Sequence, residues 1–418
     1  MKINSQWRRV ERRRSDMRKR VSPPLTAILV VIAMILAGCG TADDGESSDP
    51  GAVDEAPDDA VDEAPADTDS DEAPGEAAEG EEVELQLATY TGPASADAVA
   101  YEEWIARVDE LTGGTVQIEM FISESLLPAT EILQGVAAGR ADLGAMSFFY
   151  FPSDVPLTFI VNLPYQTDNP PAEAMAFRDL YEENEAYRNQ YEENGVVNLF
   201  NWIAPTPPVM GCTEPVESLA DLEGRSVRVG GLIAEAWEPL GVEIVTLPAG
   251  EVRESIERGL IDCWAGLTLD LVPDLGLDEV TPYLYDWGWG NFGTYEMLVN
   301  QDVWEQLSDA QRQAIDQASD ELIERYSEIT DPVMDEVCSR IAETDAEVRV
   351  LDEQVQQEWR NLAEDRVNEA FYDLAEANGI SRDVAEEFFN DYQAALDRHE
   401  PEFPDTQNPL ERCAEADL

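Results

Sequence analysis

Two stretches of the chain repeat one short pattern 120 residues apart, and this repeat limits the possible folds more than any other feature. Residues 131–142 (EILQGVAAGRAD) align without gaps with residues 251–262 (EVRESIERGLID). In both copies a glutamate begins a predicted helix, a glycine ends it, and an aspartate enters the next predicted strand. The segments around both copies follow the same order of strands and helices. The repeat therefore predicts two similar α/β lobes.

The strands and helices of both lobes follow from apolar periodicity. In the first lobe, residues 83–90 alternate as a strand, residues 96–111 carry a helical apolar stripe, and residues 115–121 and 141–146 are predicted strands. In the second lobe, residues 218–266 are predicted to form a strand, helix, strand, helix, strand unit. Two such units that face each other across the carboxyl ends of their strands enclose a cleft.

Arg228 ends the first strand of the second unit. Val227 and Val229 point to one face of that strand, so Arg228 points to the other, directly before two glycines. Ligands of open parallel sheets collect beyond the carboxyl ends of the strands, and the planar guanidinium of arginine suits a carboxylate. We therefore predict that Arg228 binds the acid group of a ligand.

Other predicted ligand residues come from both sides of the cleft. We expect Ser147 to Tyr150 of the first lobe to lie opposite Arg228 and Trp264 of the second. The aromatic segment at 283–300 crosses between the lobes, and from it we add Asn291, while Trp287 and Trp289 fit the hinge better. The full set of predicted ligand-binding residues is Ser147, Phe148, Phe149, Tyr150, Arg228, Trp264 and Asn291.

The charge of the chain excludes some partners. It has 89 Asp and Glu against 26 Lys and Arg, with a formal net charge of −63, and its two lysines, Lys2 and Lys19, lie near the N-terminus. Nucleic acids and anionic lipids are bound through Lys and Arg that neutralise phosphate. We therefore expect no nucleic-acid partner, and membrane contact only through an N-terminal lipid anchor.

The first 38 residues have the layout of an export signal. A basic segment precedes a thirteen-residue apolar run at 25–37, which is too short for a comfortable transmembrane helix. The run leads into Leu-Ala-Gly-Cys, which looks like the lipobox of bacterial lipoproteins, so Cys39 is the predicted lipidated N-terminus. We predict an exported protein anchored to the outer face of the cytoplasmic membrane, on the periplasmic or cell-wall side. An uncleaved anchor is the alternative.

Four cysteines remain besides Cys39, and an even number in an exported protein permits disulfides. Four cysteines allow three pairings. We favour Cys212 with Cys263, because both belong to the predicted sheet of the second lobe. Cys338 with Cys413 would then pin the C-terminal tail to a helix, and free buried thiols are the alternative.

The sequence contains few residues or motifs that would support an enzymatic function. His399 is its only histidine, and the HExxH, GxSxG, Walker and GxGxxG motifs are absent. No cluster of His and Cys has the spacing of metal ligands. We expect no catalytic residues, no cofactor and no such metal centre, and leave open a calcium or sodium site made of oxygen ligands.

Several of these segments resemble the extracytoplasmic solute receptors of TRAP transporters, the DctP-type family. The resemblance covers most of residues 84–400 and is carried by SLADLEGRSVRV, LGVEIVTLPAGEVRESIERGLID, EILQGVAAGRADLGAMS and LVNQDVWEQLSDAQRQAI. It implies a two-lobe periplasmic-binding-protein-like fold of the α/β class, each lobe a mixed sheet flanked by helices, with a long helix spanning both. It also implies a receptor that closes over a small organic acid and hands it to a membrane permease.

The resemblance implies that Arg228 matches the arginine that pairs with the ligand's carboxylate in this family. The chain departs from the family at two other places. Residues 207–209 (Pro-Pro-Val) stand where many members have a second arginine, and residues 263–266 (Cys-Trp-Ala-Gly) replace a polar run. These departures favour a monocarboxylate with an apolar or aromatic body. A receptor of an ABC-type importer and a surface sensor or adhesion module remain alternatives.

The expected organisation combines these segments. It consists of a signal peptide with a lipobox at 1–38, a disordered acidic linker at 39–82, lobe I at 83–205 and about 294–333, lobe II at 206–293 and about 334–405, and an irregular tail at 406–418.

Overall fold

The computed structural model describes residues 80–93, 95–404, 406, 410 and 413. The predicted signal peptide, the lipidation residue Cys39 and all but the last three residues of the predicted linker lie outside the described residues. Within the described part of the chain, no helix has the length and apolar character needed to cross a membrane.

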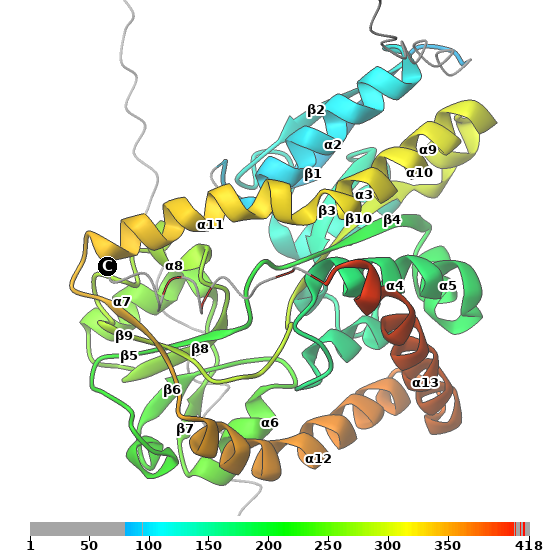
Figure 1. The fold of residues 1–418 in the computed structure, drawn as a ribbon. Coiled ribbons are helices and arrows are strands. Elements are labelled where there is room, and N and C mark those ends of the chain that lie inside the picture. The colour runs from blue at the N-terminus through cyan, green and yellow to red at the C-terminus, as the bar shows by residue number, and fades with distance from the viewer. Residues whose placement is uncertain (1–79, 94, 405, 407–409, 411–412, 414–418) are drawn as a thin grey trace, which may run out of the picture. The chain divides into compact units, whose positions relative to one another are not determined.

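Two β-sheets with helices packed around them form the framework of the described part (Figure 1). The first sheet has the order β2-β1-β3-β10-β4, formed by β1 (Val83–Thr89), β2 (Val116–Phe121), β3 (Leu143–Ser147), β4 (Val196–Ile203) and β10 (Thr294–Asn300). The second has the order β11-β9-β5-β8-β6-β7, formed by β5 (Val209–Cys212), β6 (Ser226–Arg228), β7 (Glu243–Val245), β8 (Cys263–Leu267), β9 (Tyr283–Asp286) and β11 (Glu347–Val350). We call the two sheets with their helices lobe I and lobe II.

The helices fall into three groups along the chain. Those between the strands of lobe I are α2 (Ala96–Thr112), α3 (Ile132–Ala137), α4 (Pro170–Glu183) and α5 (Glu185–Glu192). Those of lobe II are α6 (Ala234–Trp237), α7 (Val252–Glu257) and α8 (Leu271–Asp274). The remaining helices are α9 (Gln301–Gln306), α10 (Asp309–Glu324), α11 (Tyr326–Ala342), α12 (Glu353–Ala377) and α13 (Arg382–His399).

The predicted repeat is present in both lobes with the same topology. β1 pairs in parallel with β2 and β3, and β6 pairs in parallel with β7 and β8. The aspartates of the two repeats also accept equivalent hydrogen bonds. A carboxylate oxygen of Asp142 accepts from the backbone N–H of Gln86 at 2.8 Å, and one of Asp262 accepts from that of Ser226 at 2.8 Å. The aspartates are therefore structural, because Asp142 links β1 to the start of β3 and Asp262 links β6 to the start of β8.

In the described part of the chain, three passages between the lobes come before α12. Residues 204–208 join β4 to β5, and residues 287–293 join β9 to β10. The third passage is α11, which runs from α2 of lobe I to α8 of lobe II (Figure 1). The long helix expected to span the lobes is present, but it is divided at Arg325: α10 ends at Glu324, and α11, the part that reaches both lobes, begins at Tyr326.

The last helix, α13, differs from the expectation that residues 334–405 belong to lobe II. α12 contacts α6 of lobe II, but α13 packs along α4 of lobe I. The reason is an aromatic face on α13, on which Phe388 stacks against Tyr187 with ring centroids 5.4 Å apart, and Tyr392 lies 5.8 Å from Phe177.

Tryptophan side chains pack together at the hinge between the lobes. Trp287 and Trp289 pack on each other with centroids 5.0 Å apart, and Trp287 lies 4.5 Å from Trp359 of α12. The two tryptophans thus belong to the hinge, as expected.

The cysteines form the favoured pairs, with Cys212 bonded to Cys263 across β5 and β8, and Cys338 of α11 bonded to Cys413.

Candidate functional site

A cavity of about 430 Å³ lies between the lobes, at the carboxyl ends of their parallel strands. Ser147 ends β3, Arg228 ends β6 and Leu267 ends β8, and all three line the cavity. Tyr90, directly after β1, and Thr294, at the start of β10, complete the same edge. The cavity is therefore placed where open α/β sheets collect their ligands.

Arg228 is a half-buried cation in this cavity whose contacts are all neutral. Its Nε donates to the carbonyl of Leu247 at 3.0 Å, and its Nη1 donates to the carbonyl of Ala265 at 3.3 Å. Burial lowers the pKa of the guanidinium, because the charged form loses hydration there. The two carbonyl contacts fix the side chain and leave donors of its planar fork for a ligand.

The absence of a carboxylate partner distinguishes Arg228 in so acidic a protein. Among the described residues, every other arginine except Arg225 forms an ion pair with Asp or Glu. Arg225 is held by the backbone carbonyls of Glu214 and Pro215. Arg228 is therefore the described arginine best placed to pair with an external acid group.

The aromatic turn at 148–150 contributes two of its three residues to the cavity. Phe149 and Tyr150 line it, and the Phe149 ring lies 5.1 Å from that of Phe292, which lines it too. Phe148 does not, because it is fully buried against Phe159, with centroids 4.7 Å apart. The structure thus brings together Ser147, Phe149, Tyr150 and Arg228, and removes Phe148 from the predicted set.

Trp264 is also a core residue and not part of the cavity wall. It is fully buried, and its Nε1 donates to Thr281 Oγ1 at 3.1 Å. The ring lies over Gly211 of the neighbouring strand β5, where an added Cβ would be only 2.3 Å from it. This covering of Gly211 turns the indole toward the core that contains Val252 and Met334, away from the ligand space.

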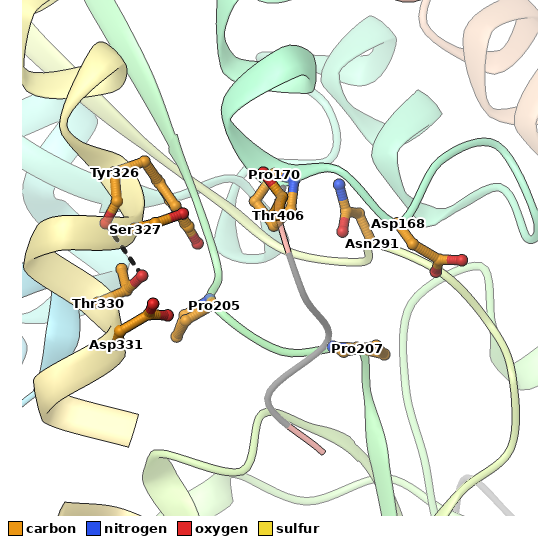
Figure 2. Close-up of a pocket in the computed structure, with 10 residues that line it drawn as sticks. All are labelled: Asp168, Pro170, Pro205, Pro207, Asn291, Tyr326, Ser327, Thr330, Asp331 and Thr406. Atoms are coloured by element: carbon orange, nitrogen blue, oxygen red, sulfur yellow. Dashed lines mark hydrogen bonds between the residues drawn. The ribbon is translucent and has the colours of Figure 1, made fainter. Parts of the chain in front are cut away.

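Asn291 lies on the other side of the hinge from the cavity. Its Nδ2 donates to a carboxylate oxygen of Glu173 at 2.8 Å. Figure 2 shows it in a small pocket with Pro205 and Pro207 of the first crossing and Tyr326 of α11. The next residue, Phe292, lines the cavity, so Asn291 and Phe292 lie on opposite sides of this crossing.

Several wall residues are outside the predicted set. They include Tyr90, Thr246, Leu247, Pro248, Ala249, Leu267, Thr268, Leu271, Phe292 and Tyr295. Tyr90 and Leu267 could have been found from the rule that ligands lie beyond strand ends, because Tyr90 ends a predicted strand and Leu267 directly follows the predicted unit at 218–266. The residues at 246–249 follow β7 in the same way.

The wall is mainly apolar apart from Arg228 and several hydroxyl groups. Burial raises the pKa of Tyr90 and of Tyr295 well above the usual value, so both phenols are neutral hydrogen-bonding groups. Within the described part of the chain, no group of three or more His, Cys, Asp or Glu side chains is arranged to hold a metal ion. The arrangement can bind a small anion with an apolar body.

Comparison with known proteins agrees with this geometry. Residues 87–373 match the family described as bacterial extracellular solute-binding protein, family 7 (DctP). The monocarboxylate 2-oxoacid-binding periplasmic protein of Nostoc sp. is 30% identical over 229 residues, which cover 52% of this chain and 60% of the relative's own length. The ectoine-binding periplasmic protein TeaA of Halomonas elongata is 26% identical over 299 residues, or 70% of this chain and 85% of TeaA.

Solved structures share the two-lobe fold. A TRAP solute-binding protein from Rhodoferax ferrireducens, in complex with copurified benzoate, superposes with a TM-score of 0.65 at 18% identity, covering 76% of this chain and 99% of its own. The predicted fold is thereby confirmed, and a family of solute-binding proteins is consistent with the expectation that the chain is not an enzyme. The chain belongs to family 7 of the bacterial extracellular solute-binding proteins, the DctP family.

Proposed function

We propose that this protein is the extracytoplasmic receptor of a TRAP-type importer and that it binds a small monocarboxylate with an apolar or aromatic body. Arg228 holds the carboxylate through a bidentate contact, and the aromatic residues of both lobes exclude water from the site. The lobes close about the crossings at 204–208 and 287–293, and the loaded receptor delivers the acid to the membrane permease.

The observation that carries the proposal is that Arg228 is half-buried and forms no ion pair with a carboxylate of the described residues. A half-buried guanidinium without a carboxylate partner is costly, because its two hydrogen bonds to carbonyls offset only part of the lost hydration. In a chain with 89 acidic residues, an unpaired arginine at this position is best explained by an acid that the protein itself does not supply.

The cavity wall supports one acid group rather than two. Among the described residues that line the cavity, Arg228 is the only Arg, Lys or His. Phe149, Phe292 and Leu271 offer apolar surface for the rest of the ligand. The names of two proteins similar to this chain, a monocarboxylate 2-oxoacid-binding protein and a receptor with benzoate, agree with this class of ligand.

Lipid anchoring is part of the proposal. The lipobox-like residues before Cys39 support it, and the replacement Cys39→Ser tests it. The wild-type protein, expressed with its leader, should sediment with membranes, and the variant should be released. Equal sedimentation of both proteins would contradict lipid anchoring through Cys39.

A thermal-shift screen of small carboxylates tests the ligand class. A ligand that binds only the folded state stabilises it, by about 2.7 kcal/mol at one hundred times its dissociation constant. We expect aromatic and apolar monocarboxylates to raise the melting temperature by a few degrees. Dicarboxylates of similar size should have smaller effects, because the described cavity has one cation.

Two results would contradict the proposal. A screen in which no carboxylate changes the melting temperature would remove the receptor function. A screen in which dicarboxylates or neutral sugars stabilise the protein more than monocarboxylates would keep a binding function but refute the assigned ligand class.

A further inference from the structure

Four glycines line the cavity, and Gly230 differs from the others in the space around it. An added Cβ would lie 2.8 Å from Cε1 of Phe149 at Gly231, and 2.7 Å from Cδ1 of Ile233 at Gly266. At Gly293 it would make an ordinary contact with Ala204, at 3.6 Å. At Gly230 it would meet no heavy atom of the described residues within 4 Å.

Backbone conformation does not require glycine at position 230 either. Gly231 has φ +66° and Gly266 has φ +77°, in the left-handed region where a side chain is strained. Gly230 lies outside that region. Neither packing nor backbone strain therefore accounts for the missing side chain, and its effect is to leave free space in the cavity.

The space over Gly230 adjoins Arg228. Along residues 227–230 the chain alternates between buried valines and half-buried Arg228 and Gly230. The pairing with β7 also extends one residue past β6, because Val229 N donates to the carbonyl of Val245 at 3.2 Å. In extended backbone, residues two apart share a face. An acid held by Arg228 would therefore place its body above the Gly230 backbone.

Aromatic rings of lobe I face this backbone. The Phe149 ring is the nearest neighbour of the Cβ position at Gly231. Tyr150 lies close enough to Arg228 that the guanidinium counteracts the rise in the phenol's pKa that burial produces. The cavity is thus lined by bare peptide backbone at Gly230 and by the aromatic rings of Phe149 and Tyr150, which together suit a planar ring.

We propose that Gly230 is a specificity-determining residue, because the missing side chain admits the flat ring of an aryl monocarboxylate whose carboxylate pairs with Arg228. This inference rests on the proposed function and narrows it from apolar monocarboxylates in general to planar aryl acids. A side chain at position 230 would occupy the space of the ring and leave the carboxylate contact intact.

Titration calorimetry with benzoate and acetate tests the inference on wild-type protein, Gly230→Ala and Gly230→Val. We expect benzoate to bind at least about tenfold more weakly to Gly230→Val, because misfit in an apolar pocket has effects of this size. Gly230→Ala should have a smaller effect, and acetate should bind all three proteins within about twofold of one another.

Gly250→Val is the matched control, because an added Cβ at Gly250 also meets no described atom within 4 Å, and Gly250 does not line the cavity. It should bind benzoate like the wild type. Melting temperatures of all variants show whether each is folded.

Three results overturn the inference. They are unchanged benzoate affinity in Gly230→Val, an equal loss for acetate and benzoate, and wild-type protein that binds only non-aromatic acids. The last of these leaves the proposed function intact, whereas wild-type protein that binds no acid refutes both.

Discussion

Glu173 of α4 is a carboxylic acid buried at the hinge, with 1% of its surface exposed. It accepts hydrogen bonds from Nδ2 of Asn291 in the second crossing and from the hydroxyl of Tyr392 in α13. Burial raises its pKa to about 7, against these hydrogen bonds, which favour the ionised form. Folding therefore favours the protonated acid, and the hinge carries a group that titrates near neutral pH.

The stability of the protein should depend on pH through Glu173. Because its pKa is raised on folding, its contribution is fully present below the ordinary value of 4.5 and is lost as pH rises through about 7. This shift corresponds to about 3 kcal/mol between pH 4.5 and 8. In Glu173→Gln, the decline of the free energy of unfolding over this range should be smaller by a similar amount.

Urea denaturation of both proteins at several pH values provides the measurement. Parallel pH dependences of the wild type and Glu173→Gln would show that Glu173 does not titrate in this range.

The role of Asn291 illustrates what could not be predicted at the residue scale. Asn291 and Phe292 are neighbours in the crossing at 287–293, and from the sequence either could face the ligand. The path of the crossing between the lobes decides the choice, and that path depends on contacts with α4 and α11 far away in the chain. Arg228, by contrast, was predictable because the alternating valines beside it fix its face.

At the scale of elements, β8 shows how a neighbouring strand decides the role of a side chain. Trp264 is the partner of Arg228 in the parallel pair and of Gly211 in the antiparallel pair. Its indole lies over the glycine and donates to Thr281 Oγ1. The sequence does not reveal this, because the pairing of β5 with β8 joins residues 51 positions apart at the disulfide.

The replacement Trp264→Phe should therefore affect stability and spare binding. It removes the hydrogen bond to Thr281 and part of the buried surface, so the free energy of unfolding should fall by about 0.5–3 kcal/mol. Affinity for the acid found in the screen should stay within about twofold of the wild type. A large loss of affinity in a variant that remains folded would return Trp264 to the binding site.

The repeat was predictable at this scale because the residues that define it lie close together in the sequence. A helix-ending glycine and the aspartate three residues later recur in both lobes, with Gly139 at φ +68° and Gly259 at φ +66°. These residues act within one strand-helix-strand unit, so short-range pattern was enough to predict both units and the shared edge where their strands end.

At the scale of the whole described molecule, the two lobes were predictable and the position of the last helix was not. The apolar face of α13 predicts that this helix packs against another element, but α4 and α6 both carry buried apolar residues, so the sequence leaves the partner open. Stacking of Phe388 on Tyr187 places α13 against lobe I. Together, α12 and α13 link the lobes outside the crossings, and the Cys338–Cys413 bond joins the chain after α13 back to α11.

The central claim is that both lobes close around an acid whose carboxylate pairs with Arg228. It is tested most directly by the affinity of Arg228→Met for the best acid of the screen, measured by calorimetry. Arg258→Met is the matched control, since Arg258 lies in the same lobe but pairs with Glu254 at the exposed surface. The two variants lose the same charge.

A charge-assisted contact contributes about 1.5–3 kcal/mol, so Arg228→Met should bind the acid roughly ten- to a hundredfold more weakly or worse. Arg258→Met should bind it like the wild type. Wild-type affinity in a folded Arg228→Met protein would contradict the account.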